Sequence, residues 1–174
     1  MKAKRAWTIL QIPHGDCKGA VYVEFLIAFL PMLILFSGLF QLGVAQTADL
    51  VTQHAAVTAA RAAMVVLPDD PQYYDGIPEN HVQGARLDDI TSAAAMSLTA
   101  IDPAPKVQVN IPSKPGGTDN RPVVGEHDIV ITQVKYTFPC RVPIGNLLVC
   151  GFDGEKTLTG EAAMPNQGTN ESYR

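Results

Sequence analysis

Apolar side chains are concentrated in one long stretch near the N-terminus. No charged residue occurs from Phe25 to Ala48, a run of 24 residues. As an α-helix, this run would rise about 36 Å, which exceeds the thickness of a bilayer hydrocarbon core, about 30 Å. The pattern predicts a membrane-spanning helix with one carboxylate, Glu24, at its start. Because an unpaired carboxylate is costly in lipid, we expect Glu24 either to have a function or to stay at the level of the headgroups.

A helical pattern continues beyond the apolar run, so we predict one long helix over residues 20–66. Pro31 removes a backbone donor and is expected to kink this helix, and Pro68 is expected to end it. Small side chains in its last third would let another surface approach closely. The chain's own domain is the favoured surface, and a neighbouring subunit is the alternative. These side chains are Ala55, Ala56, Ala59, Ala60, Ala62 and Ala63.

Residues 67–174 are predicted to form a small α+β domain. Apolar residues at spacings of three and four predict one buried helix face. Polar and apolar residues alternate over 107–111, 128–138 and 157–164, which predicts three strands in an antiparallel meander. The inward face of the second strand would carry Val130, Val134, Tyr136 and Phe138, and the helix face would carry Leu87, Ile90, Ala94, Leu98 and Ile101.

Turn residues dominate the connecting segments at 68–80 and 113–125. In the first of these, Tyr73 and Tyr74 are expected to lay their rings on the domain, although a contact with another molecule is the alternative. The polar tail from Pro165 onward is expected to be frayed or disordered.

The N-terminal leader, residues 1–19, decides how the apolar helix is interpreted. A secretory signal has an apolar core of about 7–15 residues, which is much shorter than this run. A lipoprotein signal would place its cysteine after the apolar run, whereas Cys17 precedes it. The order of a basic leader, a glycine and then the helix is typical of a prepilin-type leader. Cleavage between Gly19 and Ala20 would make Glu24 the fifth residue of the mature chain.

Charge supports one membrane orientation and argues against one class of partner. The leader contains four basic residues and one acidic residue, a net charge of +3, and the other flank of the helix begins with Asp49. The positive-inside rule therefore places the N-terminus in the cytoplasm and the domain outside it. Loss of the leader would change the formal net charge from −4 to −7. A chain that acidic lacks the electrostatic footprint of a nucleic-acid-binding protein.

Two cysteines are candidates for a disulfide. Cys140 and Cys150 lie ten residues apart, between two predicted strands. In an oxidising periplasm they could close this loop, which would stabilise the fold by roughly 2–3 kcal/mol. Two reduced neighbouring cysteines are the alternative. Cys17 would lie on the reducing side of the membrane and stay unpaired.

The segment Gly19-Ala20-Val21-Tyr22-Val23-Glu24-Phe25, followed by Pro31 and the alanine-rich stretch 59–63, resembles the TadE-like family. These are pseudopilins, or minor pilin-like proteins, of bacterial Tad/Flp tight-adherence pilus systems. The resemblance covers residues 19–66. It implies processing by a prepilin peptidase, retention in the inner membrane and a role in pilus assembly. Other pilin-like subunits and the inner-membrane assembly platform would then be partners. The chain is much longer than the major pilins of this class, which favours a minor or assembly subunit.

Glu24 carries the most specific hypothesis. Cleavage would create an α-amine on Ala20, about one helical turn from the Glu24 carboxylate, and the two charges would attract strongly at low dielectric. Pairing within one chain or between subunits would set the helix register. This resembles the role supposed for the matching glutamate, followed here by Phe25, in type IV pilins. The alternative is a solvated carboxylate at the membrane boundary.

Catalytic and metal-binding patterns are weak in this sequence. The histidines are scattered, and Glu126-His127-Asp128 is the only acidic cluster that includes a histidine. We therefore expect no enzyme activity, no metal and no cofactor. The alternative function is an unprocessed, signal-anchored periplasmic binding or adhesion domain, and an anchored enzyme is a third possibility. Loss of the leader would distinguish the pseudopilin from the unprocessed anchor.

Overall fold

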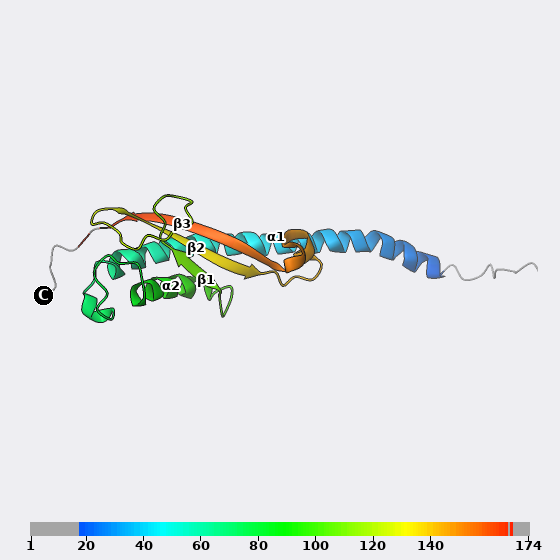
Figure 1. Ribbon diagram of the computed structural model, residues 1–174. Coiled ribbons are helices and arrows are strands. Elements are labelled where there is room, and N and C mark those ends of the chain that lie inside the picture. Colours follow the sequence, from blue (N-terminus) through cyan, green and yellow to red (C-terminus); the bar gives the residue numbers. More distant parts are fainter. Residues whose placement is uncertain (1–17, 167, 169–174) are drawn as a thin grey trace, which may run out of the picture.

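A single long helix is the axis on which the other elements are arranged. The computed structural model describes residues 18–166 and 168, so most of the expected leader, with Cys17, lies outside the described residues. Helix α1 spans Lys18–Val66 and continues through Pro31, in agreement with the helix predicted over 20–66. Figure 1 shows that its blue N-terminal part extends well beyond the domain, whereas its cyan part lies against the sheet and α2.

Three antiparallel strands form the sheet, with β2 in the centre. They are β1 (Val107–Asn110), β2 (Ile129–Pro139) and β3 (Glu155–Pro165), in the order β1-β2-β3. Val109 lies opposite Val134, which in turn lies opposite Gly160. The predicted α+β class and the predicted meander are therefore confirmed.

The core lies between this sheet and α1. The predicted inward face of β2 is buried, together with Thr132, whose hydroxyl donates to the carbonyl of Ala56 at 3.1 Å. A side chain at position 160 would collide with the carbonyl of Thr52, so Gly160 allows β3 to lie directly on α1. Five of the six alanines singled out in the sequence are fully buried against the chain's own domain, which confirms the favoured interpretation: Ala55, Ala56, Ala59, Ala60 and Ala63.

Helix α2 (Ala85–Leu98) lies alongside α1 and buries the predicted face. Ile90, Ala94 and Leu98 are fully buried, and Leu87 and Ile101 pack against the core from its edge. The sequence did not predict that Arg86 would be buried with them.

Arg86 closes the C-terminal end of α1. Its guanidinium donates to the carbonyls of Val66, Leu67, Asp69 and Ile77. The last carbonyls of a helix have no partner within the helix, so an external donor has to satisfy them. The Tyr74 ring lies 4.3 Å from the guanidinium carbon, and burial lowers the pKa of Arg86. One buried side chain thus joins α1, α2 and the loop between them.

Three short helices were not predicted. They are η1 (Pro71–Tyr73), α3 (Gly145–Val149) and η2 (Gly151–Asp153). The last two lie in the β2–β3 connection, where a disulfide joins Cys140 and Cys150 with their Cα atoms 6.5 Å apart. In addition, a side chain at position 145 would collide with the Ser37 carbonyl, so Gly145 allows α3 to touch α1.

Two expectations for the loops and the tail need correction. Tyr74 lies on the domain as expected, but Tyr73 is 76% exposed, because it belongs to η1, a short helix that buries none of its residues. The tail does not begin at Pro165, which is the last residue of β3. Asn166 is buried, and its amide nitrogen donates to the side-chain oxygen of Asn80 and to the carbonyl of Gly125. Residues 169–174 of the expected disordered tail lie outside the described residues.

Candidate functional site: the N-terminal half of the long helix

The N-terminal half of α1 has no covering element among the described residues. We call residues 21–36 the bare half: residues 21–32 are all exposed, and the remaining four are exposed or partly exposed. Its side chains are large and apolar, for example Ile27, Phe29 and Met32. Exposed apolar surface of this extent is not typical of a soluble domain. By length and composition, α1 can span a membrane once.

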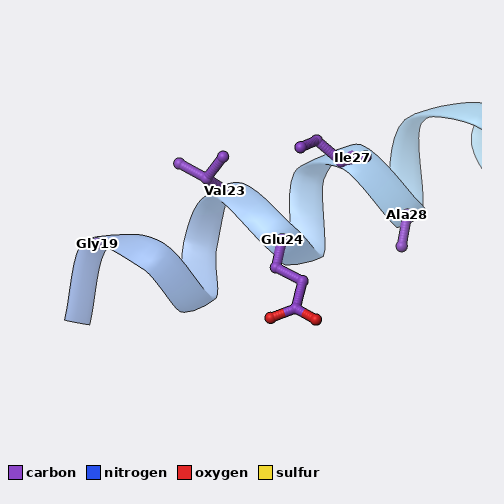
Figure 2. Close-up of a pocket in the computed structure, with 5 residues that line it drawn as sticks. All are labelled: Gly19, Val23, Glu24, Ile27 and Ala28. Carbon is purple, nitrogen blue, oxygen red and sulfur yellow. The ribbon is translucent and has the colours of Figure 1, made fainter. Parts of the chain in front are cut away.

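Glu24 interrupts this apolar surface in its first turns. Figure 2 shows that Glu24 and Ala28 extend from one side of the helix, while Val23 and Ile27 extend from the other. These four side chains and Gly19 line a shallow, open groove. Within the part of the chain that the structure describes, the Glu24 carboxylate takes part in no ion pair. It therefore lies exposed on an apolar helix, where a cationic partner would stabilise it most.

The predicted cleavage position lies in the first turn of α1. Ala20 precedes Glu24 by four residues, so the backbone nitrogen of Ala20 lies about one turn away along the helix. A side chain added at Gly19 would meet no atom within 4 Å. Within the described part of the chain, the space around this position would therefore accommodate a larger side chain.

The other predicted residues of this segment lie along the same exposed surface. The Phe25 ring stacks on that of Phe29, with centroids 5.2 Å apart. Because Pro31 has no amide hydrogen, the carbonyl of Ile27 lacks its usual donor from the helix. The kink at Pro31 remains a prediction. The free carbonyl provides one polar acceptor in an otherwise apolar surface.

The bare half ends where α3 reaches the helix. The side-chain oxygen of Gln41 accepts a hydrogen bond from the Val142 amide at 3.1 Å, and Gln41 is only 1% exposed. From Gln41 onward one face of α1 is covered, and we call residues 41–66 the packed half. Sequence reasoning missed this boundary, because the charge-free run continues through it to Ala48.

The domain contains one buried polar network that could suggest chemistry. The Tyr136 hydroxyl donates to Asp102 at 3.1 Å, and Arg141 lies 3.4 Å from the other oxygen of the same carboxylate. Burial and the neighbouring Asp102 raise the pKa of Tyr136 to about 12. Each polar group in the network has a partner, so the arrangement is that of a structural network. No group of three or more His, Cys, Asp or Glu side chains is placed to hold a metal among the residues described.

Comparison of this chain with protein families, curated proteins and solved structures finds no match. The resemblance to TadE-like pseudopilins therefore depends on the residues of α1 alone. Gly19 and Ala20 lie in the first turn of α1 and Glu24, Phe25 and Pro31 in the bare half, whereas the alanine-rich stretch 59–63 lies in the packed half.

Proposed function

We propose that this chain is a pseudopilin of the TadE-like type, an inner-membrane protein that takes part in assembling a Tad/Flp-type pilus. One observation carries the proposal. Glu24 lies exposed one turn after the Gly19–Ala20 bond, at the start of an uncovered apolar helix. A peptidase acting at that bond would place a new amine beside the carboxylate.

The proposed topology is a single pass with the N-terminus in the cytoplasm. The leader is basic, and the far flank of the apolar run begins with an acidic residue, Asp49. The domain would then lie on the periplasmic or extracellular side. The Cys140–Cys150 disulfide supports this side, because such bonds persist in oxidising compartments.

Glu24 and the Ala20 amine would act as a positioning pair. In a low-dielectric surrounding, the attraction between them would offset the cost of placing the carboxylate in lipid. Within one chain, the pair would fix the start of the helix. Between two chains, it would fix how far one helix is shifted along the other, which is the register that an assembly requires.

The packed half restricts how subunits could associate. One of its faces is already occupied by α2 and the sheet. Helix–helix contacts between subunits would therefore use mainly the bare half, where Glu24 and the Phe25–Phe29 stack are available. A membrane-proximal assembly role needs no catalytic site in the domain.

Processing provides the direct test of this proposal. We would measure the intact mass and N-terminal sequence of the membrane-extracted protein, with and without an active prepilin peptidase. The proposal expects a terminus at Ala20 that depends on the peptidase. Gly19→Leu should block processing, whereas Gly43→Leu is the matched control, because position 43 is equally open. An intact leader under both conditions would contradict the proposal and favour the unprocessed binding or adhesion domain.

A second test separates the role of Glu24 from processing. Glu24→Gln removes the charge with little change of shape, so we expect normal membrane level and normal cleavage but strongly reduced pilus output. Glu24→Asp keeps the charge and should retain more output. Equal output from wild type and Glu24→Gln would show that the carboxylate has no role in assembly.

A further inference from the structure

The β2–β3 connection exposes a cluster of large apolar side chains. Ile144, Leu147, Leu148 and Phe152 lie within nine residues, and we call them the loop patch. Leu148 is 59% exposed and Phe152 is 98% exposed. Isolated exposed apolar residues are common, but four within one short connection indicate a contact surface.

The loop patch lies beside the helix at the point where the bare half ends. Gly145 packs on the Ser37 carbonyl, and a side chain at Gly38 would lie 2.9 Å from Leu148. In Figure 1, α3 and η2 (orange) lie at the end of the domain nearest the blue part of α1. The loop patch therefore lies next to the part of α1 at which the domain stops covering the helix.

The number of helical residues before α3 indicates where the loop patch would lie relative to a bilayer that α1 crosses. A hydrocarbon core about 30 Å thick needs about 20 helical residues. Counted from Val21, such a span ends near Phe40, beside α3. If the span is counted from Phe25, the residue after the charged Glu24, it ends near Val44. In that case α3 lies just inside the edge of the hydrocarbon core. Both counts put the loop patch at the membrane surface or just below it.

We propose that the loop patch inserts into the outer surface of the same bilayer that α1 crosses, and so fixes the domain against the membrane. Its occupant is lipid, because Leu148 of the patch adjoins the apolar surface of the helix. Leu148 borders a shallow surface that also includes Leu35, Leu39 and Leu42.

Charge and covalent structure both fit a lipid occupant. Lys156 lines the same surface as Leu148. Long cationic side chains beside an apolar patch can reach lipid phosphates while their stems stay in the apolar layer. The disulfide closes the loop at its base, which limits the freedom that the loop would lose on insertion. The inference requires that α1 spans a membrane, but not that the chain acts in a pilus.

The test uses the full chain, one copy per lipid nanodisc, with a single tryptophan as the probe. The sequence contains one tryptophan, Trp7 in the leader, so Trp7→Phe provides the background. Phe152→Trp then reports on the loop patch. Tyr73→Trp is the matched control, because Tyr73 is also an exposed aromatic residue but lies in η1, which follows the C-terminal end of α1, whereas α3 packs on α1 near Ser37.

Emission is compared between discs of ordinary and brominated phosphatidylcholine. We expect the probe at position 152 to emit at shorter wavelength and to lose emission in brominated lipid, whereas the probe at position 73 should be unaffected. An unquenched, water-like signal at position 152 would overturn the proposal. A shifted but unquenched signal would also overturn it, because it would mean that protein covers the patch. Leader cleavage is not part of the readout, so this result is independent of the pilus proposal.

Discussion

The bare half and the packed half of α1 are both rich in apolar residues, but their side chains differ in size. Exposed positions of the bare half carry Phe25, Leu30 and Phe36, whereas buried positions of the packed half carry Ala48, Ala55 and Ala59. Small residues let a sheet approach the helix backbone, as Gly160 does from the other side. Large residues keep a neighbour at a distance and expose more surface to lipid. Side-chain size, more than hydrophobicity, therefore separates the part of this helix that binds its own domain from the part that stays uncovered.

The largest effect on this comparison is expected at the far end of the packed half. Arg86→Met would leave the carbonyls of Val66, Leu67, Asp69 and Ile77 without their donor in a buried site. We expect a loss of about 3–5 kcal/mol in the free energy of unfolding of the domain, measured by urea unfolding in nanodiscs. Arg61→Met is the control, since Arg61 is exposed on the same helix. Equal stabilities of the two variants would contradict the capping role of Arg86.

The disulfide should contribute the next largest effect. Replacing both Cys140 and Cys150 by serine opens the β2–β3 connection, and we expect a loss of about 2–3 kcal/mol. Cys17→Ser should leave the stability unchanged, because that thiol lies in the leader. If the double variant unfolds at the same urea concentration as Cys17→Ser, the disulfide does not stabilise the domain.

The same substitution in the two halves tests the size argument itself. Ala59→Leu would place a large side chain in the fully buried contact between α1 and the rest of the domain, and we expect a loss of about 1–3 kcal/mol. Ala28→Leu adds the same atoms to an exposed position of the bare half, so the stability of the domain should not change. A similar loss of stability in both variants would show that the two halves do not differ in their tolerance of a larger side chain.

The smallest effect concerns high pH. The pKa of Tyr136 is raised from 10.0 to about 12 in the folded chain. The native state therefore retains this proton in a range where the unfolded state has lost it, so stability is fully present below pH 10 and decreases as the pH rises towards 12. Tyr136→Phe should reduce this decrease in a comparison of urea unfolding at several pH values. An unchanged pH dependence would mean that Tyr136 is not the group responsible.

Local patterns were sufficient to predict the main elements. The long helix, the apolar face of α2 and the three strands follow from the spacing of apolar residues, and Pro68 marks the end of α1. The alanine-rich stretch also indicated that another surface would pack closely on the helix. These features depend on neighbouring residues along the chain.

Features that depend on distant residues could not be predicted. Arg86 directly precedes Leu87, the first residue of the predicted apolar face. Its hydrogen-bond partners are carbonyls between Val66 and Ile77, which the fold brings next to the start of α2. Asn166 is buried through contacts with Asn80 and Gly125, far away in the sequence. Helix α3 packs on α1 at Ser37, and no periodic pattern in its own short sequence predicts it. At the candidate site, the roles of Glu24 and Gly19 stay predictions from the sequence, and the point at which the domain begins to cover the helix was not predicted.

The division of α1 into an uncovered bare half and a packed half is tested most directly by the reactivity of single thiols at three positions. Single cysteines would replace Leu30, Leu50 and Ala59 in a Cys17→Ser background with the disulfide intact, and a membrane-impermeant maleimide would be added before and after detergent. The division predicts that Leu30→Cys reacts only after detergent, that Leu50→Cys, which is 71% exposed, reacts in both conditions, and that Ala59→Cys reacts in neither until the domain unfolds. Reaction of Leu30→Cys in intact membranes at the rate of Leu50→Cys would contradict it.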